Sequence, residues 1–346
     1  MIETKAPGKL FIAGEYAVVE PGYPSILTSV NQFISVSLEE GLNEGSISSG
    51  GKYLPLARED NKLILNKDDN SFSYIISAIK TVEAYVREQG KNLGFYHLKV
   101  YSQLQNDNGK KYGLGSSAAV TAATVRALCK YYEINASDME IFKLSALAQL
   151  SLNKIGSCGD IAAVVYGGWV SYSSFDRNWV LKKRNNVTIT ELIDKRWPHL
   201  LIEPLAPPEK LRLVVGWTGS PASTINLVDD INKKKITHSK VYNEFLYESR
   251  KCVTKMINAF KEDDIKEIQR QVLRNRQLLV DMGNTLGVEI ETPLLKKLCD
   301  IAIEFNGAAK SSGAGGGDCG IVILEDERQM PQIIREWKKW GITYLN

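Results

Sequence analysis

Residues 111–120 (KYGLGSSAAV) constrain the fold more than any other stretch of the sequence. Gly113 and Gly115 are followed by two serines and then by an alanine-rich run. Glycine permits backbone angles and close approaches that a Cβ forbids. Serines at a helix start add hydroxyl groups to backbone amides that no helical carbonyl satisfies, and this end of the helix dipole attracts anions. The segment therefore predicts a loop that wraps a phosphate at the start of a helix.

Composition excludes several classes of protein. The chain has 346 residues, of which 44% are hydrophobic and 24% charged, and its net charge of +3 is too small for a nucleic-acid-binding face. Five scattered cysteines without a CxxC pair and only three histidines predict neither a disulfide framework nor a zinc site. No stretch resembles a membrane span, and the first ten residues lack the pattern of a signal peptide. We therefore expect a cytoplasmic protein with no nucleic-acid or membrane partner.

Hydrophobic periodicity predicts mixed α and β structure along the whole chain. Alternation of apolar and polar residues predicts strands, at 33–38, 97–101, 211–215 and 321–324. Helical spacing and capping signals predict helices, at 75–86, 116–132, from Ser137, twice within 239–282, from Thr292 to Gly307, and over 328–340. The proline-containing segment 187–208 is expected to be irregular and to join two domains, 1–205 and 206–346.

Three separate segments are richer in glycine than turns require: 6–19, 111–120 and 310–320. A Walker-type phosphate motif does not occur anywhere in the sequence. Gly315, Gly317 and Gly320 match the dinucleotide pattern, but a predicted strand follows them where that pattern requires a helix. The residues therefore favour ligand-contacting loops of another kind.

In their order and spacing, the three segments resemble the three signature motifs of the GHMP kinase family of small-molecule kinases. The resemblance extends over essentially the whole chain. It implies a two-domain α+β fold, with a left-handed βαβ crossover in the N-terminal domain and a ferredoxin-like C-terminal domain. The general rule for crossovers is right-handed, so this handedness rests on the resemblance alone.

Within the family, the chain looks most like the bacterial-type phosphomevalonate kinases. The residues that carry this likeness lie at 8–19, 109–117, 156–160, 216–224 and 310–321. The likeness implies phosphorylation of (R)-5-phosphomevalonate to (R)-5-diphosphomevalonate in the mevalonate pathway of isoprenoid precursor synthesis, with ATP as co-substrate and Mg²⁺ as cofactor. The expected partners are therefore small molecules. Oligomeric state cannot be read from the sequence, and a homodimer is one option.

The resemblance also implies roles for individual residues. Lys9 and Asp160 correspond to the catalytic pair. The expected ATP-binding residues are Lys111, Gly113, Leu114, Gly115, Ser116, Ser117 and Ala118, with Ser117 as the hydroxyl that contacts magnesium. The expected substrate-binding residues are Lys9, Tyr16, Ser157, Ser220, Ser223, Thr224, Ser311, Ser312, Gly313, Ala314 and Gly315.

One residue departs from the family's pattern, and the chemistry of the acceptor changes the role expected of another. Mevalonate kinases carry a magnesium-binding glutamate at the position that corresponds to Gln149, so a second protein ligand for magnesium is missing there. The acceptor of the proposed reaction is a phosphate oxygen, whose second pKa of about 6 leaves it ionised at neutral pH. We therefore expect Asp160 to position Lys9 or the substrate rather than to act as a base, and Lys9 to neutralise the two phosphates.

The sequence leaves open which residues bind the acceptor, and two other functions are also compatible with it. Two phosphates must approach each other, so the acceptor site needs further positive charge, for which Arg196 and Lys5 are weak candidates. Mevalonate kinase is the nearest alternative activity, and Tyr16 argues against it because histidine is common there. A non-catalytic nucleotide or metabolite sensor on the same scaffold is the alternative from another class, and the presence of Ser117 and Asp160 argues against it.

Overall fold

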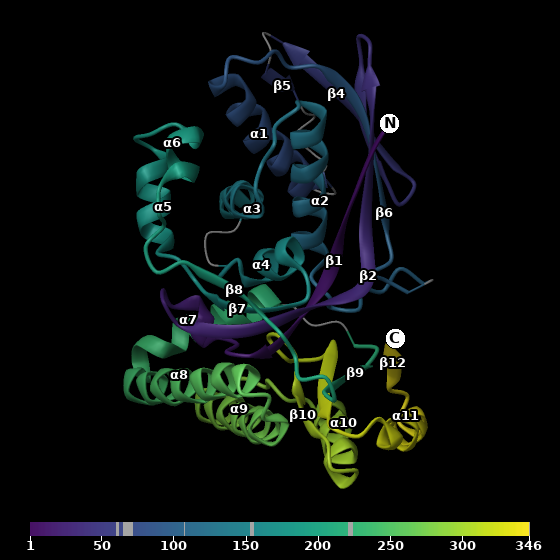
Figure 1. Cartoon of the computed structure of the whole chain (residues 1–346), viewed down its shortest axis with the longest axis vertical. Helices are drawn as coiled ribbons and strands as arrows, with labels where there is room; N and C mark the ends of the chain where they lie inside the picture. The colour runs from purple at the N-terminus through teal and green to yellow at the C-terminus, as the bar shows by residue number, and fades with distance from the viewer. Residues whose placement is uncertain (60–61, 65–71, 107, 153–155, 221–223, 346) are drawn as a thin grey trace.

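The computed structural model describes the chain except for residues 60–61, 65–71, 107, 153–155, 221–223 and 346. The described residues form two regions, each built on its own sheet (Figure 1). No helix among them is both long and apolar enough to cross a lipid bilayer.

The larger region contains an eight-stranded sheet of order β5-β4-β3-β6-β2-β7-β8, in which β1 pairs with β2. The strands are β1 (Ile2–Ala13), β2 (Pro24–Gly41), β3 (Gly45–Ser49), β4 (Lys52–Glu59), β5 (Lys62–Ile64), β6 (Phe95–Ser102), β7 (Trp169–Ser173) and β8 (Leu201–Leu205). Strands β3 and β6 run parallel and are joined through β4, β5 and α1 (Ser73–Glu88). The left-handed turn that the resemblance implies for the crossover stays a prediction.

Helices cover one face of this sheet (Figure 1). Besides α1 they are α2 (Ser116–Tyr131), α3 (Asp138–Leu152), α4 (Gly159–Tyr166), α5 (Arg177–Arg184) and α6 (Ile189–Asp194). Helix α2 packs closely on β1 because its alanines are fully buried and small, and the Thr4 hydroxyl donates a hydrogen bond to the Ala123 carbonyl at 2.8 Å. The predicted capping box at the start of α3 is confirmed, since Ser137 and Glu140 each accept from the other's backbone amide.

The expectation of an irregular segment at 187–208 was wrong. Helix α6 begins there with a capping box between Thr188 and Glu191, and β8 pairs with β7 in the large sheet. Elements of five or six residues are too short to show a clear hydrophobic period, which is why the sequence pattern missed them. The domain boundary placed between 205 and 206 stays a prediction, although β8 ends at Leu205 and the next strand belongs to the smaller sheet.

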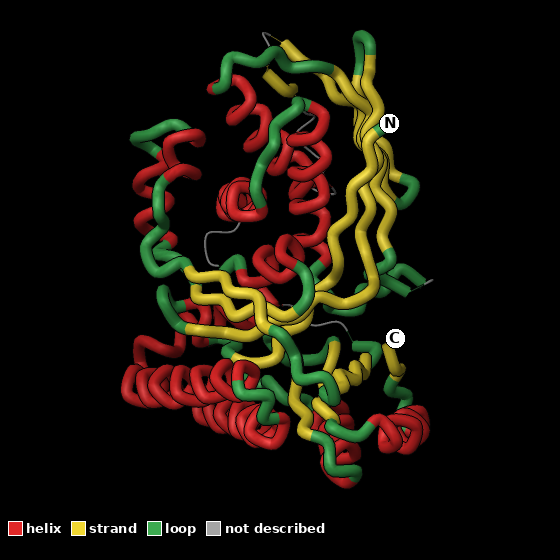
Figure 2. Tube along the Cα trace, viewed as in Figure 1, coloured by secondary structure: helices red, strands yellow, loops and turns green. Residues whose placement is uncertain are grey.

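The smaller region has a four-stranded antiparallel sheet of order β10-β11-β9-β12. Its strands are β9 (Arg212–Trp217), β10 (Ala308–Ser311), β11 (Cys319–Leu324) and β12 (Thr343–Leu345), and its helices are α7 (Thr224–Thr237), α8 (Ser239–Lys261), α9 (Ile265–Leu286), α10 (Pro293–Glu304) and α11 (Met330–Lys339). This strand order is that of the expected ferredoxin-like arrangement. Figure 2 shows most of these helices at the bottom of the view, with the small sheet beside α8 and α9, which themselves contact strands of the larger region.

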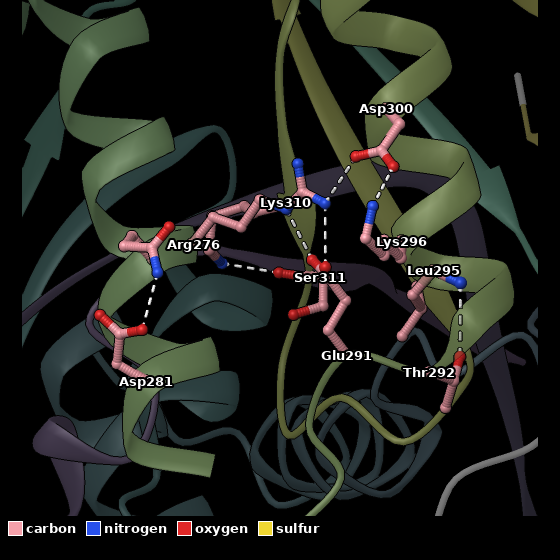
Figure 3. A network of polar contacts seen from close by, with 10 residues as sticks. Arg276, Asp281, Glu291, Thr292, Leu295, Lys296, Asp300, Lys310 and Ser311 are labelled. Atoms are coloured by element: carbon pink, nitrogen blue, oxygen red, sulfur yellow. Dashed lines mark hydrogen bonds and ion pairs between the residues drawn. The ribbon is translucent and has the colours of Figure 1, made fainter. Parts of the chain in front are cut away.

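A polar network joins α9 to α10 and holds the segment that supports the third glycine-rich loop (Figure 3). Arg276 donates to both carboxylate oxygens of Glu291, at 2.6 and 2.9 Å, and to Asp300 at 3.0 Å. Thr292 caps α10, as the sequence predicts, by accepting from the Leu295 amide. Ile290 precedes Glu291 of this network, and its carbonyl accepts a hydrogen bond from the amide of Gly316. The network therefore holds the segment on which the third glycine-rich loop packs.

Candidate active site

The two regions enclose a cavity of about 420 Å³ at their junction. It is lined by most of the residues that the sequence predicts for the site, namely Lys9, Tyr16, Lys111, Gly113, Leu114, Gly115, Ser116, Ser117, Ser157, Asp160, Gly313 and Ala314. All three glycine-rich segments contribute to this set, although they are separated by up to about 300 positions in the sequence.

The loop before α2 has the geometry that the glycines predict. Gly113 and Gly115 have φ of 80° and 77°, in the left-handed region that side chains disfavour. A Cβ on Gly115 would also stand 2.9 Å from two carbon atoms of Lys9. The Lys9 amide donates to the Leu114 carbonyl at 2.8 Å, which fastens β1 to the loop. Gly113, Leu114 and Gly115 line the cavity, and α2 begins directly after them at Ser116.

Lys9 and Asp160 approach the cavity from different elements. Lys9 is a buried residue of β1, and its Nζ donates to the Gly113 carbonyl at 3.5 Å. Asp160 lies in the first turn of α4, where its Oδ1 accepts from the Ile161 amide at 3.0 Å. Among the hydrogen bonds and ion pairs of the described residues, none joins Lys9 to Asp160. Both side chains therefore line one cavity without neutralising each other.

The third glycine-rich loop is bound to β1 and to the turn that follows it. The Tyr16 hydroxyl donates to the Ala314 carbonyl at 2.5 Å. Burial, and after it the charge of Glu15, raises the pKa of this hydroxyl, so it remains a donor at neutral pH. Glu15 itself accepts from the Gly313 amide and pairs with Lys310. These contacts hold the loop at the cavity.

Several predicted residues do not line the cavity. Ala118 is fully buried and packs inside the larger region. Ser311 is a buried residue of β10, and the Ser312 hydroxyl bridges the Phe11 amide and carbonyl at 2.9 Å, which makes it a clip between the regions. A Cβ on Gly315 would lie 2.1 Å from the Ile290 carbonyl, so this glycine is explained by close packing on that segment.

The residues predicted to bind the acceptor's phosphate do not line the cavity or lie outside the described residues. The Ser220 carbonyl accepts from the Asp318 amide, but Ser220 does not line the cavity. Ser223 and the side chain of Thr224 lie outside the described residues, so their roles stay predictions. Lys5 lies over the ring of Phe33 and Arg196 is exposed, and neither lines the cavity. Both were weak candidates for the acceptor's charge, and this placement does not support them.

The cavity lining also contains Asp318 and apolar residues, to which the sequence pattern gives no role, and Gln149, which the sequence marks as a departure from the family pattern. Asp318 lines the cavity, and so do the apolar side chains of Val18, Val19 and Val228. Gln149 also lines it and is 9% exposed, with its Oε1 buried and unpaired within the described structure. These residues come from segments far apart in the chain, so no local sequence pattern predicts that they line one cavity.

Arg177 is a further residue that the sequence did not single out. Its Nη1 is buried and has no hydrogen-bond partner among the described residues. Burial, followed by the charges of Cys158 and Asp160, raises the pKa of the Tyr172 hydroxyl, and the charge of Arg177 opposes that shift. The Tyr172 hydroxyl donates to the carbonyl of the cavity residue Ser157 at 2.5 Å. Arg177 is therefore a cation within electrostatic reach of the Ser157–Asp160 end of the cavity.

The donor groups in the cavity fit magnesium better than zinc. Within the described residues, no group of three or more His, Cys, Asp or Glu side chains could hold a metal ion by itself. The lining does contain the Ser117 hydroxyl and carboxylates. Mg²⁺ commonly takes one or two protein oxygens and completes its shell with substrate phosphates and water, so this sparse oxygen set suits it.

Known protein families that match this chain are kinases of small molecules. Residues 73–168 match the profile of the GHMP kinases N-terminal domain, and residues 256–343 match that of the GHMP kinases C-terminal domain. A phosphomevalonate kinase from a Streptomyces species is 38% identical over 98% of this chain and 95% of its own length.

Solved structures are similar over the same length. A protein from Listeria innocua superposes with a TM-score of 0.94 at 38% identity, covering 99% of this chain and 96% of that one. Phosphomevalonate kinase from Streptococcus pneumoniae, in complex with phosphomevalonate and AMPPNP, superposes with a TM-score of 0.88 at 28% identity, covering 100% and 99%.

Proposed function

Because this chain belongs to the GHMP kinase family, we propose that it transfers the γ-phosphoryl group of ATP to the phosphate of (R)-5-phosphomevalonate, giving ADP and (R)-5-diphosphomevalonate. The observation that carries the proposal is the convergence of the phosphate loop, Lys9 and Asp160 on one cavity. The likeness to two phosphomevalonate kinases supports this choice of acceptor. Five buried free cysteines suit a reducing compartment and support a cytoplasmic location.

The chemistry of the acceptor determines what the residues have to do. A phosphate monoester has a second pKa of about 6, so the attacking oxygen is already ionised at neutral pH. Catalysis then depends on aligning two anions and neutralising their charge rather than on removing a proton. The Lys9 ammonium group, which is buried beside the phosphate loop, supplies fixed positive charge there.

Magnesium is the cofactor that we propose, and the Ser117 hydroxyl is the residue that would hold it at the start of α2. Bound there, it would supply positive charge to the phosphate oxygens of ATP. Lys111 and the loop amides near Gly113 and Gly115 surround the same phosphates in this proposal. Their hydrogen bonds orient the γ-phosphoryl group toward the Asp160 side of the cavity.

The acceptor occupies the remaining part of the cavity in this proposal. Val18, Val19 and Val228 offer an apolar wall for its hydrocarbon chain. Ser157 offers a hydroxyl, and Arg177, which does not line the cavity and whose Nη1 has no hydrogen-bond partner among the described residues, adds positive charge near that end. The planar guanidinium group of arginine can bind two oxygens of a phosphate or carboxylate at once, which suits it to such anions better than the ammonium group of lysine.

An assay that couples ADP release to NADH oxidation tests the proposal. Mevalonate, phosphomevalonate and homoserine are supplied in parallel with ATP and Mg²⁺. We expect ADP release with phosphomevalonate only, and NMR of the product should show a diphosphate. ADP release with mevalonate alone would replace the proposed acceptor, whereas ADP release with none of the three, combined with tight nucleotide binding, would favour the sensor alternative.

A further inference from the structure

Glu20 connects the turn after β1 to two helices of the smaller region. Its Oε1 accepts from the Lys235 Nζ at 2.8 Å and from the Tyr242 hydroxyl at 3.1 Å. Lys235 lies in the last turn of α7 and Tyr242 in the first turn of α8, so one carboxylate oxygen receives a hydrogen bond from each helix. The Lys235 Nζ also lies 5.5 Å from the centre of the Tyr242 ring. The three side chains form a contact between the regions that is not part of the cavity lining.

The contact at Glu20 is partly sheltered from water, and its backbone is fixed. The side chains of Glu20 and Lys235 are 27% and 29% exposed, so their pair is screened less than one on the open surface. Burial, and after it the charge of Glu20, raises the pKa of the Tyr242 hydroxyl, which therefore remains a donor at neutral pH. The Glu20 carbonyl accepts from the Ser174 hydroxyl at 3.0 Å. Glu20 is thus a fixed anchor for the corner between α7 and α8.

Both ends of this contact lead to the apolar wall that we propose for the acceptor's hydrocarbon chain. Glu20 directly follows Val18 and Val19, which line the cavity. Lys235 lies seven positions after Val228 in α7, which places the two residues on one face of the helix, two turns apart. Val228 lines the cavity from the other region. The ion pair therefore ties together the two segments that form this wall.

We propose that Glu20 is a positioning residue for the acceptor and acts through Lys235 and Tyr242. Their contacts hold α7 where Val228 completes the apolar wall. This inference rests on the proposed function and goes further, because it makes binding of the acceptor depend on an ion pair outside the cavity. The phosphate loop precedes α2 in the larger region, so binding of ATP should not depend on this pair.

Steady-state kinetics of Glu20→Gln and Lys235→Met test the inference. Each substitution removes the ion pair with little change in side-chain volume. We expect each to raise the KM for phosphomevalonate by about three- to fivefold, the upper range for an ion pair that is not fully buried, with the KM for ATP unchanged. A purely electrostatic effect on the anionic acceptor would instead raise this KM in Lys235→Met and lower it in Glu20→Gln. Two increases are therefore the signature of positioning.

A charge-reversed variant and a matched control sharpen the comparison. Glu20→Lys combined with Lys235→Glu restores the attraction with the partners exchanged, so its KM for phosphomevalonate should return toward that of the wild type. Lys266→Met removes the same charge from an exposed pair with Glu325 in the smaller region. Its KM should equal that of the wild type.

Hydrogen exchange of the unliganded protein gives a readout that does not depend on any substrate. The backbone amides of α7 should exchange several-fold faster in Glu20→Gln and Lys235→Met than in the wild type, whereas those of α10 should not change. Unchanged exchange in α7 would overturn the inference, and so would an unchanged KM in both variants or shifts of opposite sign, while the proposed function would stand. If the wild type does not phosphorylate phosphomevalonate, the proposed function fails and this inference fails with it.

Discussion

Lys310 donates to a carboxylate oxygen of Glu15, and this ion pair joins the two regions in the interior of the protein. The side chains are 0% and 2% exposed, and Lys310 also donates to the Ser311 carbonyl at 2.7 Å. Removing one partner leaves the other as an uncompensated buried charge. We expect Lys310→Met to lower the free energy of unfolding by about 3–5 kcal/mol, measured by urea denaturation followed by circular dichroism.

A double substitution distinguishes the loss of the Glu15–Lys310 ion pair from the loss of side-chain packing. Glu15→Gln alone should also be strongly destabilising, because Lys310 then lacks its counter-ion. The double variant Glu15→Gln with Lys310→Met should be more stable than Lys310→Met alone, since no isolated charge remains. Additive losses in the double variant would show that the two side chains contribute independently.

Arg177 is expected to act on the acceptor and not on ATP. Arg177→Gln should raise the KM for phosphomevalonate several-fold, because it removes a positive charge near the Ser157–Asp160 end of the cavity, with little change in the KM for ATP. Arg177→Lys keeps the charge but loses the planar guanidinium group, so an intermediate KM is expected. Steady-state kinetics at saturating ATP provide the measurement. Arg196→Gln, at an exposed arginine, is the matched control and should behave like the wild type.

The sequence predicted the parts of the site that are built from local patterns. The phosphate loop depends on Gly113 and Gly115, whose left-handed backbones are dictated within a few residues. The caps at Ser137 and Thr292 are local for the same reason. The caps need no knowledge of distant segments, because the interacting residues lie three positions apart.

The parts that the sequence missed depend on contacts between distant segments. Glu15 meets Lys310 across 295 positions, and the Ser312 hydroxyl meets Phe11 across 301. This contact of the Ser312 hydroxyl could not be predicted from its own segment, and the predicted role of Ser312 in binding substrate stays a prediction. The place of Asp318 in the cavity could not be predicted either, because it depends on the phosphate loop that Asp318 touches. Function was therefore easier to predict than the positions of individual side chains.

Lys9 and Asp160 should differ in how much they contribute to turnover. Lys9→Met removes positive charge beside the phosphate loop and should lower kcat by more than Asp160→Asn does. Because the acceptor phosphate is already ionised, Asp160→Asn should cost well under the ~10²–10⁴ that a lost acid–base group costs. Single-turnover quench-flow measurements at saturating substrates compare the two. The opposite ranking would show that Asp160 acts as a base.

Gln149 is expected to keep the cavity free of an additional negative charge. Its Oε1 is buried, and Gln149→Glu would place a carboxylate among groups that receive two phosphates. We expect the KM for phosphomevalonate to rise by about tenfold, equivalent to roughly 1.4 kcal/mol of added repulsion. Gln149→Met has a similar volume without the charge and should raise KM less. Equal effects of the two substitutions would assign the loss to packing.

The five buried cysteines predict how stability depends on pH in the alkaline range. Burial raises the pKa of Cys129, Cys252 and Cys299 to about 12, whereas an unfolded thiol ionises near 8.5. Above that pH the unfolded state holds fewer protons than the native state, so stability falls as pH rises. The loss reaches up to about 1.4 kcal/mol per pH unit for each thiol. Urea unfolding between pH 8 and 11 measures this slope.

A thiol count and a substitution test the origin of that slope. In the native protein at pH 8, Ellman's reagent should find no reactive thiol, and in urea it should find five, since all five cysteines are free and buried. Cys129→Ala removes one titrating group, so its unfolding free energy should fall less steeply with pH, by up to about 1.4 kcal/mol per unit. Tyrosines with raised pKa values contribute equally to both proteins, so the difference isolates the thiol. Identical slopes would mean that Cys129 is ionised to the same extent in the native and unfolded states.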